Sequence, residues 1–198
     1  MIFFAINFIY IIFILLICVF FKKKEKKKLI FKPLKFYSAY ELENHKKGQK
    51  IMTDMLKEFH NFCVKNNINY WIHAGTLIGA VRHQGWIPHD GDIDICMLED
   101  DFLKLIELYD NDKEKYWFQN KYTDEFYFSK NIPGRIRSLK YMYVDVVDRS
   151  WYHGIQIDIF ILFSDKNGKV TLPEKDKELK YINNINQIFP LQELKFED

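Results

Sequence analysis

The chain has 198 residues, of which 48% are hydrophobic and 17% aromatic, so it has enough apolar material for the core of one domain. The formal net charge is +2, but the run Lys22 to Lys28 contributes +5, which leaves −3 for the rest. This balance excludes a basic nucleic-acid-binding domain, and we expect no nucleic-acid partner. Three cysteines without a CxxC pair exclude a disulfide framework and a cysteine-based zinc site.

The first 21 residues carry no charged side chain and are long enough to cross a bilayer as a helix. We predict an uncleaved, single-pass membrane anchor over residues 1–21, with membrane contact through residues 2–21. A signal peptide is the alternative, but it requires a basic start, a shorter apolar core and a small-residue cleavage site. The lysines that follow favour a cytosolic position for the domain. They serve either as a headgroup-binding run or as a solvated charge cluster.

Residues 22–45 are predicted to form a basic juxtamembrane segment and a linker, and residues 46–198 the domain. Hydrophobic residues at spacings of three and four predict helices, and short apolar runs between Gly, Pro and Asn predict strands. The predicted helices are 46–67, 76–81 and 101–109. The predicted strands are 70–72, 93–97, 116–118, 126–128, 135–147 and 154–163, with a tight turn at 165–168.

Asp90, Asp92 and Asp94 occupy every second position, and the last two accompany the apolar strand 93–97. Period two is strand spacing, so Asp92 and Asp94 leave the same face of the sheet, while Asp90 falls in the approach loop. Two such carboxylates repel each other unless a cation lies between them. Oxygen ligands of this kind predict Mg2+ or Mn2+ rather than zinc.

A third carboxylate is expected from Asp158, which lies in the apolar strand GIQIDIFIL. An acid between isoleucines is costly to place in a sheet unless a charged group meets it. An edge-strand aspartate that faces water is the alternative. Asp145 and Asp148 are competitors with less apolar surroundings.

Four more residues are candidates for binding a phosphate-bearing cofactor or lining its site. Gly75 and Thr76 open a predicted helix, where backbone N–H groups and a hydroxyl favour an anion, although a glycine at such a turn also serves backbone geometry alone. Arg82 either clamps a phosphate or pairs with a carboxylate. His89 is the histidine expected to lie nearest the site.

Two other metal sites fit the pattern less well. Asp90, Asp92, Asp94 and Asp101 mimic four positions of a calcium-binding EF-hand loop, but Ile95 stands where that loop requires glycine. The histidines at positions 73, 83 and 89 have spacings of ten and six, which match no zinc pattern.

The segment HAGTLIGAVRHQGWIPHDGDIDICM, residues 73–97, resembles the signature of the LicD/fukutin family of phosphotransferases. GIQIDIFILF, residues 154–163, and FPLQELKFED, residues 189–198, resemble two later family segments, so the likeness covers residues 51–198. The sequence differs from the family pattern at Gly91, His89, Ile161 and Phe163. The chain also stops before the Tyr-Gly-containing end that members usually carry, so we expect the domain to be C-terminally incomplete.

The resemblance implies an α/β (α+β) domain with a nucleotidyltransferase-like mixed sheet and flanking helices, here preceded by the predicted transmembrane helix. It implies that Asp92, Asp94 and Asp158 bind Mg2+ or Mn2+, and that Gly75 and Thr76 form the phosphate edge. It also implies that a phospho-alcohol, such as phosphocholine or ribitol phosphate, moves from a CDP-activated alcohol to a glycan or glycoconjugate hydroxyl. Eukaryotic members act in the secretory lumen, in conflict with the lysine placement.

Two other functions remain open from the sequence. The same fold serves a nucleotidyl transferase that uses a nucleoside triphosphate. A non-catalytic, membrane-anchored domain that binds glycan or protein is the third hypothesis, prompted by Gly91 and by the position at which the chain stops.

Overall fold

The computed structural model describes residues 39–110, 115–129, 132–142, 154–171 and 184–197. Within these ranges no helix combines the length and the apolar character that a membrane crossing requires. The predicted anchor, residues 1–21, lies outside them, as do Asp145 and Asp148.

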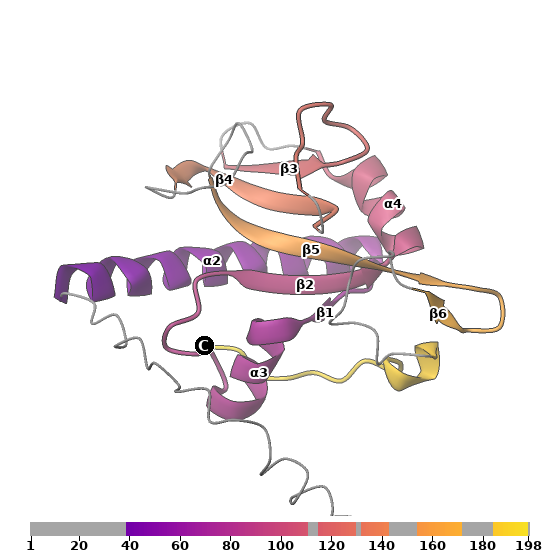
Figure 1. The fold of residues 1–198 in the computed structure, drawn as a ribbon, viewed down its shortest axis with the longest axis horizontal. Coiled ribbons are helices and arrows are strands. Elements are labelled where there is room, and N and C mark those ends of the chain that lie inside the picture. Colours follow the sequence, from indigo (N-terminus) through magenta and orange to yellow (C-terminus); the bar gives the residue numbers. More distant parts are fainter. Residues whose placement is uncertain (1–38, 111–114, 130–131, 143–153, 172–183, 198) are drawn as a thin grey trace, which may run out of the picture. The chain divides into compact units, whose positions relative to one another are not determined.

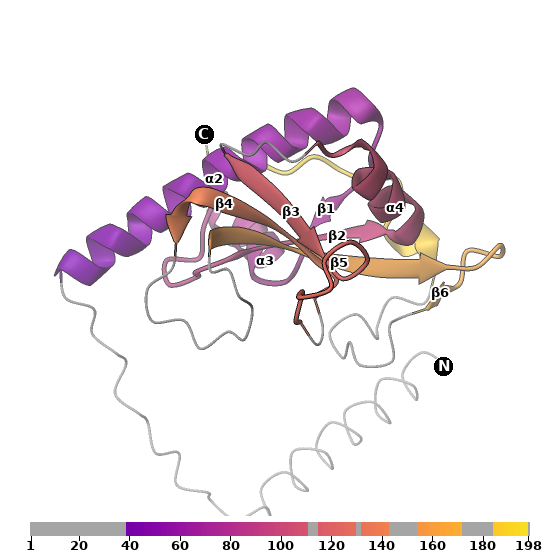
Figure 2. The same cartoon turned by 90° about the horizontal axis from the view of Figure 1, so that it is seen from above.

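Helix α2, Ala39–Asn66, is the longest described element and lies along one face of the sheet (Figures 1 and 2). Its buried apolar residues recur at spacings of three and four, which places them on one stripe of the helix; they are Met52, Met55, Leu56, Phe59 and Cys63. The helix ends where Asn67 adopts a left-handed φ of 53°. The predicted end is therefore confirmed, whereas the helix begins seven residues earlier than the predicted start at Lys46.

The sheet is mixed, with the strand order β1-β2-β5-β4-β3 and a short β6 paired with β5. Strands β2 and β5 run parallel, and the other pairs are antiparallel. The strands are β1 Trp71–Ile72, β2 Ile93–Leu98, β3 Tyr116–Asn120, β4 Gly134–Met142, β5 Gly154–Ser164 and β6 Val170–Thr171. The remaining helices are α3 Ala74–His83, α4 Glu99–Leu108 and the short 3-10 helix η2 Ile185–Gln187. The predicted α/β class is thus confirmed as a mixed sheet with flanking helices.

The two faces of the sheet differ in chemistry because successive side chains of a strand point to opposite sides. The odd-numbered residues of β2 and β5 pack with α2 and α4 in the main core; they are Ile93, Ile95, Met97, Ile155, Ile157, Ile159 and Ile161. The even-numbered residues form the opposite face. Cys96 and Leu162 pack there with Phe160 and with Ile185 of η2, while polar residues occupy the part nearer the start of β5.

One predicted strand is wrong. Residues 126–128 form no strand, because Asp124 organises a turn: its carboxylate accepts the Phe126 backbone N–H at 2.9 Å, and its carbonyl accepts the Tyr127 N–H at 3.0 Å. An Asp side chain that bonds the backbone two residues later is a common turn device. The aromatic run Phe126 to Phe128 therefore belongs to a loop, residues 121–129.

Candidate functional site

Three aspartates meet on the polar part of the sheet face opposite α2. Asp94 of β2 and Asp158 of β5 are directly opposite each other in the parallel register, and Asp92 immediately precedes β2. One carboxylate oxygen from each of the three lies within 4.8 Å of the others. The structure therefore brings together the three residues that the sequence suggested as a metal site, and we call them the aspartate triad.

The electrostatics of the triad favour a cation. Burial, followed by the charges of Asp158 and Asp90, raises the pKa of Asp92 from 3.8 to about 6. Like charges that face each other on neighbouring strands destabilise a sheet unless an opposite charge lies among them. Three clustered carboxylate oxygens are the hard ligand set that Mg2+ and Mn2+ prefer, so the residues present fit the predicted ion.

The start of helix α3 is fastened to strand β2 beside the triad. The Thr76 hydroxyl accepts the backbone N–H of Asp94 at 2.9 Å, and the His73 N–H donates to the Asp94 carbonyl at 2.9 Å. Thr76 is buried, and this bond gives its hydroxyl a definite structural task. Its phosphate-binding role stays a prediction.

Gly75 and Asp90 lie in direct contact across the same region. A Cβ on Gly75 would collide with Oδ2 of Asp90, so a larger residue at position 75 would force the Asp90 carboxylate to move. Asp90 also raises the pKa of Asp92 by its charge and by a hydrogen bond. Asp90 lies in the approach loop, as the sequence suggested, and it also contacts the triad.

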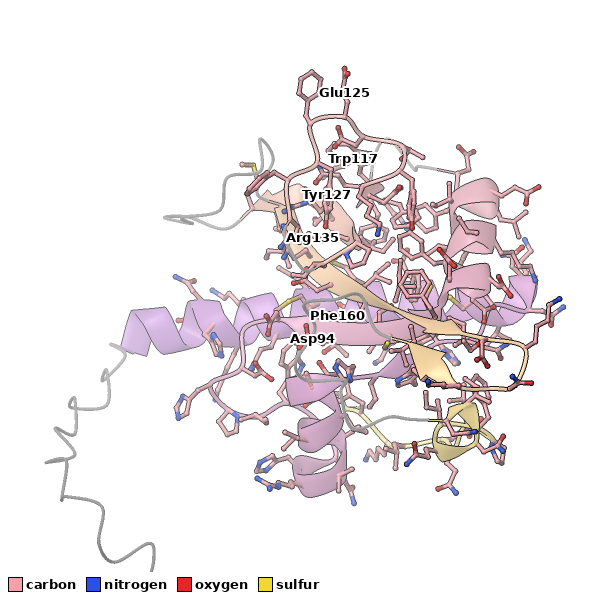
Figure 3. All side chains as sticks on the ribbon, turned by 45° about the vertical axis from the view of Figure 1, so that its right-hand side comes forward. Asp94, Trp117, Glu125, Tyr127, Arg135 and Phe160 are labelled. Carbon is pink, nitrogen blue, oxygen red and sulfur yellow. The ribbon has the colours of Figure 1, made fainter. Side chains whose placement is uncertain are left out.

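A buried arginine, absent from the sequence-based site, faces Asp158. Arg135 of β4 donates from Nε to Oδ1 of Asp158 at 3.0 Å, and the two side chains are 9% and 6% exposed. The strand register makes these residues direct neighbours, and Gln119 of β3 continues the same row. Figure 3 shows Asp94, Arg135 and Tyr127 among the side chains of this region. Two arginines separated by one isoleucine in a strand were the available signal, but the partner could be known only from the register.

The remaining predicted residues lie at the surface. Arg82 is exposed in the last turn of α3, and His89 is exposed in the loop that leads to β2. Among the described residues no histidine joins the carboxylate cluster, which disfavours the zinc alternative. Residues 93–98 form a strand where an EF-hand requires a loop, so the calcium alternative is excluded.

The sequence is similar to known proteins over most of the described domain. Residues 67–198 match the family described as LicD/FKTN/FKRP, nucleotidyltransferase domain. An uncharacterised protein of Rickettsia prowazekii is 30% identical over 153 residues, which are 75% of this chain and 48% of that protein. A Rickettsia typhi protein is 32% identical over 145 residues, 72% of this chain and 38% of that protein.

A further relative, whose name states an activity, is the lipopolysaccharide cholinephosphotransferase LicD of Haemophilus influenzae. It is 38% identical over 79 residues, which are 40% of this chain and 26% of that protein. The chain thus spans less than half the length of each of these relatives.

Proposed function

The chain belongs to the LicD/FKTN/FKRP nucleotidyltransferase-domain family, and from this premise we propose that it is a metal-dependent phosphotransferase. It moves a phospho-alcohol from a CDP-activated donor to a hydroxyl of a glycan or glycoconjugate. The observation that carries the proposal is the aspartate triad, whose clustered oxygens fit a divalent cation. The likeness to a lipopolysaccharide cholinephosphotransferase supports phosphocholine as one donor group.

In this proposal Asp92, Asp94 and Asp158 hold Mg2+ or Mn2+, which when bound neutralises the charge of the donor pyrophosphate. Gly75 and Thr76, at the start of α3, bind the donor phosphates through backbone N–H groups and the Thr76 hydroxyl. Arg82 and His89 bind the donor from the surface. The acceptor hydroxyl attacks the phosphorus that bears the alcohol, and the bond to the bridging oxygen breaks. Asp158 accepts the hydroxyl proton, and CMP leaves.

The proposed acceptor and the membrane anchor agree with each other. Glycans under construction are commonly attached to lipid, and an anchor over residues 1–21 would hold the domain beside such an acceptor. The side of the membrane follows from neither feature: the lysine run favours the cytosol, and the family likeness favours the secretory lumen.

The purified chain, supplied with Mn2+ and either CDP-choline or CDP-ribitol, is expected to release CMP. The double variant Asp92→Ala with Asp94→Ala removes two of the three ligands and should lower the rate at least about 100-fold. Asp100→Ala, an exposed aspartate on α4, is the matched control and should retain the wild-type rate. Equal turnover by the double variant would refute the mechanism.

Two other outcomes select the alternatives. The family description names a nucleotidyltransferase domain, which favours testing nucleoside triphosphates in the same assay. Release of pyrophosphate in place of CMP would identify a nucleotidyl transferase. Failure of the purified chain to bind Mn2+ in calorimetry would favour a non-catalytic binding domain.

A further inference from the structure

Arg137 of β4 is a deeply buried charge on the same sheet face as the triad, 1% exposed. Its Nε donates to the Gln119 side-chain oxygen at 2.7 Å. Its Nη1 donates to the Gln156 side-chain oxygen at 2.6 Å and to the Gly154 carbonyl at 3.5 Å. A guanidinium stays charged in a protein, so burying it is costly unless hydrogen-bond acceptors surround it.

The direction of these bonds fixes the orientation of both glutamines. A guanidinium only donates, so each amide must turn its oxygen to Arg137 and its NH2 group away. The Gln156 NH2 donates to Oδ1 of Asp158 at 2.7 Å, and the Gln119 NH2 donates to Oδ2 of Asp124 at 2.6 Å. Arg137 therefore orients two amides, and each amide donates a hydrogen bond to a carboxylate. Gln156 donates to Asp158, and Gln119 donates to Asp124. We call this chain Asp158–Gln156–Arg137–Gln119–Asp124 the arginine relay.

The far end of the relay organises the 121–129 loop. The other oxygen of Asp124 accepts the Phe126 N–H at 2.9 Å, and its carbonyl accepts the Tyr127 N–H at 3.0 Å. Burial raises the pKa of Tyr127, and the charges of Arg135, Asp158 and Arg137 also act on its phenol. Tyr127 lies near Arg135, the ion-pair partner of Asp158, and the relay bonds its loop to Asp158 (Figure 3).

We propose that Arg137 is a positioning residue that couples the 121–129 loop to the Asp158 carboxylate. Gln156 holds Oδ1 of Asp158, together with Arg135, so the angle at which this carboxylate meets a cation depends on the relay. By thermodynamic reciprocity, a cation on the triad then also orders the loop. The cation itself rests on the proposed function, whereas the link between Asp158 and the loop does not.

The first test measures Mn2+ affinity in variants that leave the aspartates intact. Gln156→Leu removes the donor to Asp158 and should weaken Mn2+ binding about tenfold, the usual size of such an effect. Gln119→Glu keeps its shape and its acceptor for Arg137 but cannot donate to Asp124. Position 119 is separated from Asp158 by Arg137 and Gln156 in the relay, and the variant should still weaken Mn2+ binding several-fold. Thr123→Val removes a hydrogen bond of the same loop, from the Asn120 side chain at 2.8 Å, without touching the relay, and should leave affinity unchanged.

The second test needs no metal. In hydrogen exchange on the full-length chain, Gln156→Leu should speed exchange of the Phe126 and Tyr127 amides, although it lies on another strand. A double-variant comparison can be added to the Mn2+ measurements of the first test. Gln119→Glu and Gln156→Leu combined should weaken Mn2+ binding by less than the sum of the two single free-energy changes, because each variant alone already interrupts the relay. Unchanged loop exchange in Gln156→Leu would overturn the relay even if Mn2+ binds. Absence of Mn2+ binding to the wild type would instead overturn the proposed function, and loop exchange would still decide the relay.

Discussion

At the scale of single residues, Asp92 should set the pH dependence of metal binding. A cation binds the ionised carboxylate, and the pKa of Asp92 is raised to about 6 by burial and by the charges of Asp158 and Asp90. Mn2+ affinity, measured by calorimetry, should therefore be constant above pH 7 and fall about tenfold per pH unit below 6. Asp90→Asn removes one of the neighbouring charges and should move this midpoint to lower pH. A midpoint that stays unmoved would contradict the assigned cause.

The same shift has a definite sign for the stability of the metal-free protein. The folded-state pKa of Asp92 lies above the ordinary aspartate value of 3.8, so the folded state binds the proton more tightly than the unfolded state. The contribution of Asp92 to the free energy of unfolding should accordingly rise as pH falls through about 6 towards 4. Bound Mn2+ keeps Asp92 ionised, so saturating Mn2+ should abolish this rise. Denaturant unfolding at pH 4 to 8, with and without Mn2+, measures both effects.

The residues of the site differ in how far the sequence predicts them. Asp92 and Asp94 follow from period-two spacing beside an apolar strand, and Asp158 follows from the cost of an acid among isoleucines. The sequence does not predict the burial of the arginines at positions 135 and 137, because a charged residue in a strand can equally well face solvent. Their burial depends on which strand lies opposite, and the register of β3, β4 and β5 is a property of the folded chain.

At the scale of elements, two helical glycines should respond oppositely to alanine. A Cβ on Gly48 of α2 meets nothing within 4 Å, so Gly48→Ala should raise the free energy of unfolding by about 0.5–1 kcal/mol. A Cβ on Gly79 of α3 would collide with the backbone carbonyl of Gly85, which cannot rotate away. Gly79→Ala should therefore lower the free energy of unfolding by about 1–3 kcal/mol. Denaturant unfolding of both variants checks this, and equal signs would refute the close packing of α3 against its following loop.

Element types were predicted more reliably than element boundaries. Helices α2 and α4 appear where apolar residues recur at helical spacing, because such a stripe is buried against the sheet. Helix α3 also appears where it was predicted, but its buried residues are Thr76, Gly79 and Ala80, and its larger apolar side chains are exposed. The aromatic run at residues 126–128 predicted a strand on composition alone, and the turn-forming hydrogen bonds of Asp124 prevailed. The parallel pairing of β2 with β5, which brings Asp94 opposite Asp158, joins strands about sixty residues apart and has no local signal.

At the scale of the whole described domain, Trp86 joins three segments that are distant in sequence. Its Nε1 donates to the Thr53 hydroxyl of α2 at 2.9 Å. The centroid of its ring lies 5.6 Å from the centroid of the Phe196 ring. Its backbone N–H donates to Oε1 of Glu197 at 3.0 Å. The loop between α3 and β2, which carries Asp90 towards the triad, is thus held between α2 and the segment 184–197.

Phe196→Ala tests whether this segment supports the loop. Phe196 is half-buried against Trp86 and the main core, so its loss should lower the free energy of unfolding by about 1–2 kcal/mol. Because Trp86 then loses one of its three supports, Mn2+ affinity should also fall, although Phe196 is no ligand. Leu194→Ala, at a residue 49% exposed in the same segment, should change stability by less than about 0.5 kcal/mol. A loss of stability at unchanged Mn2+ affinity would show that the segment braces the core without positioning the approach loop.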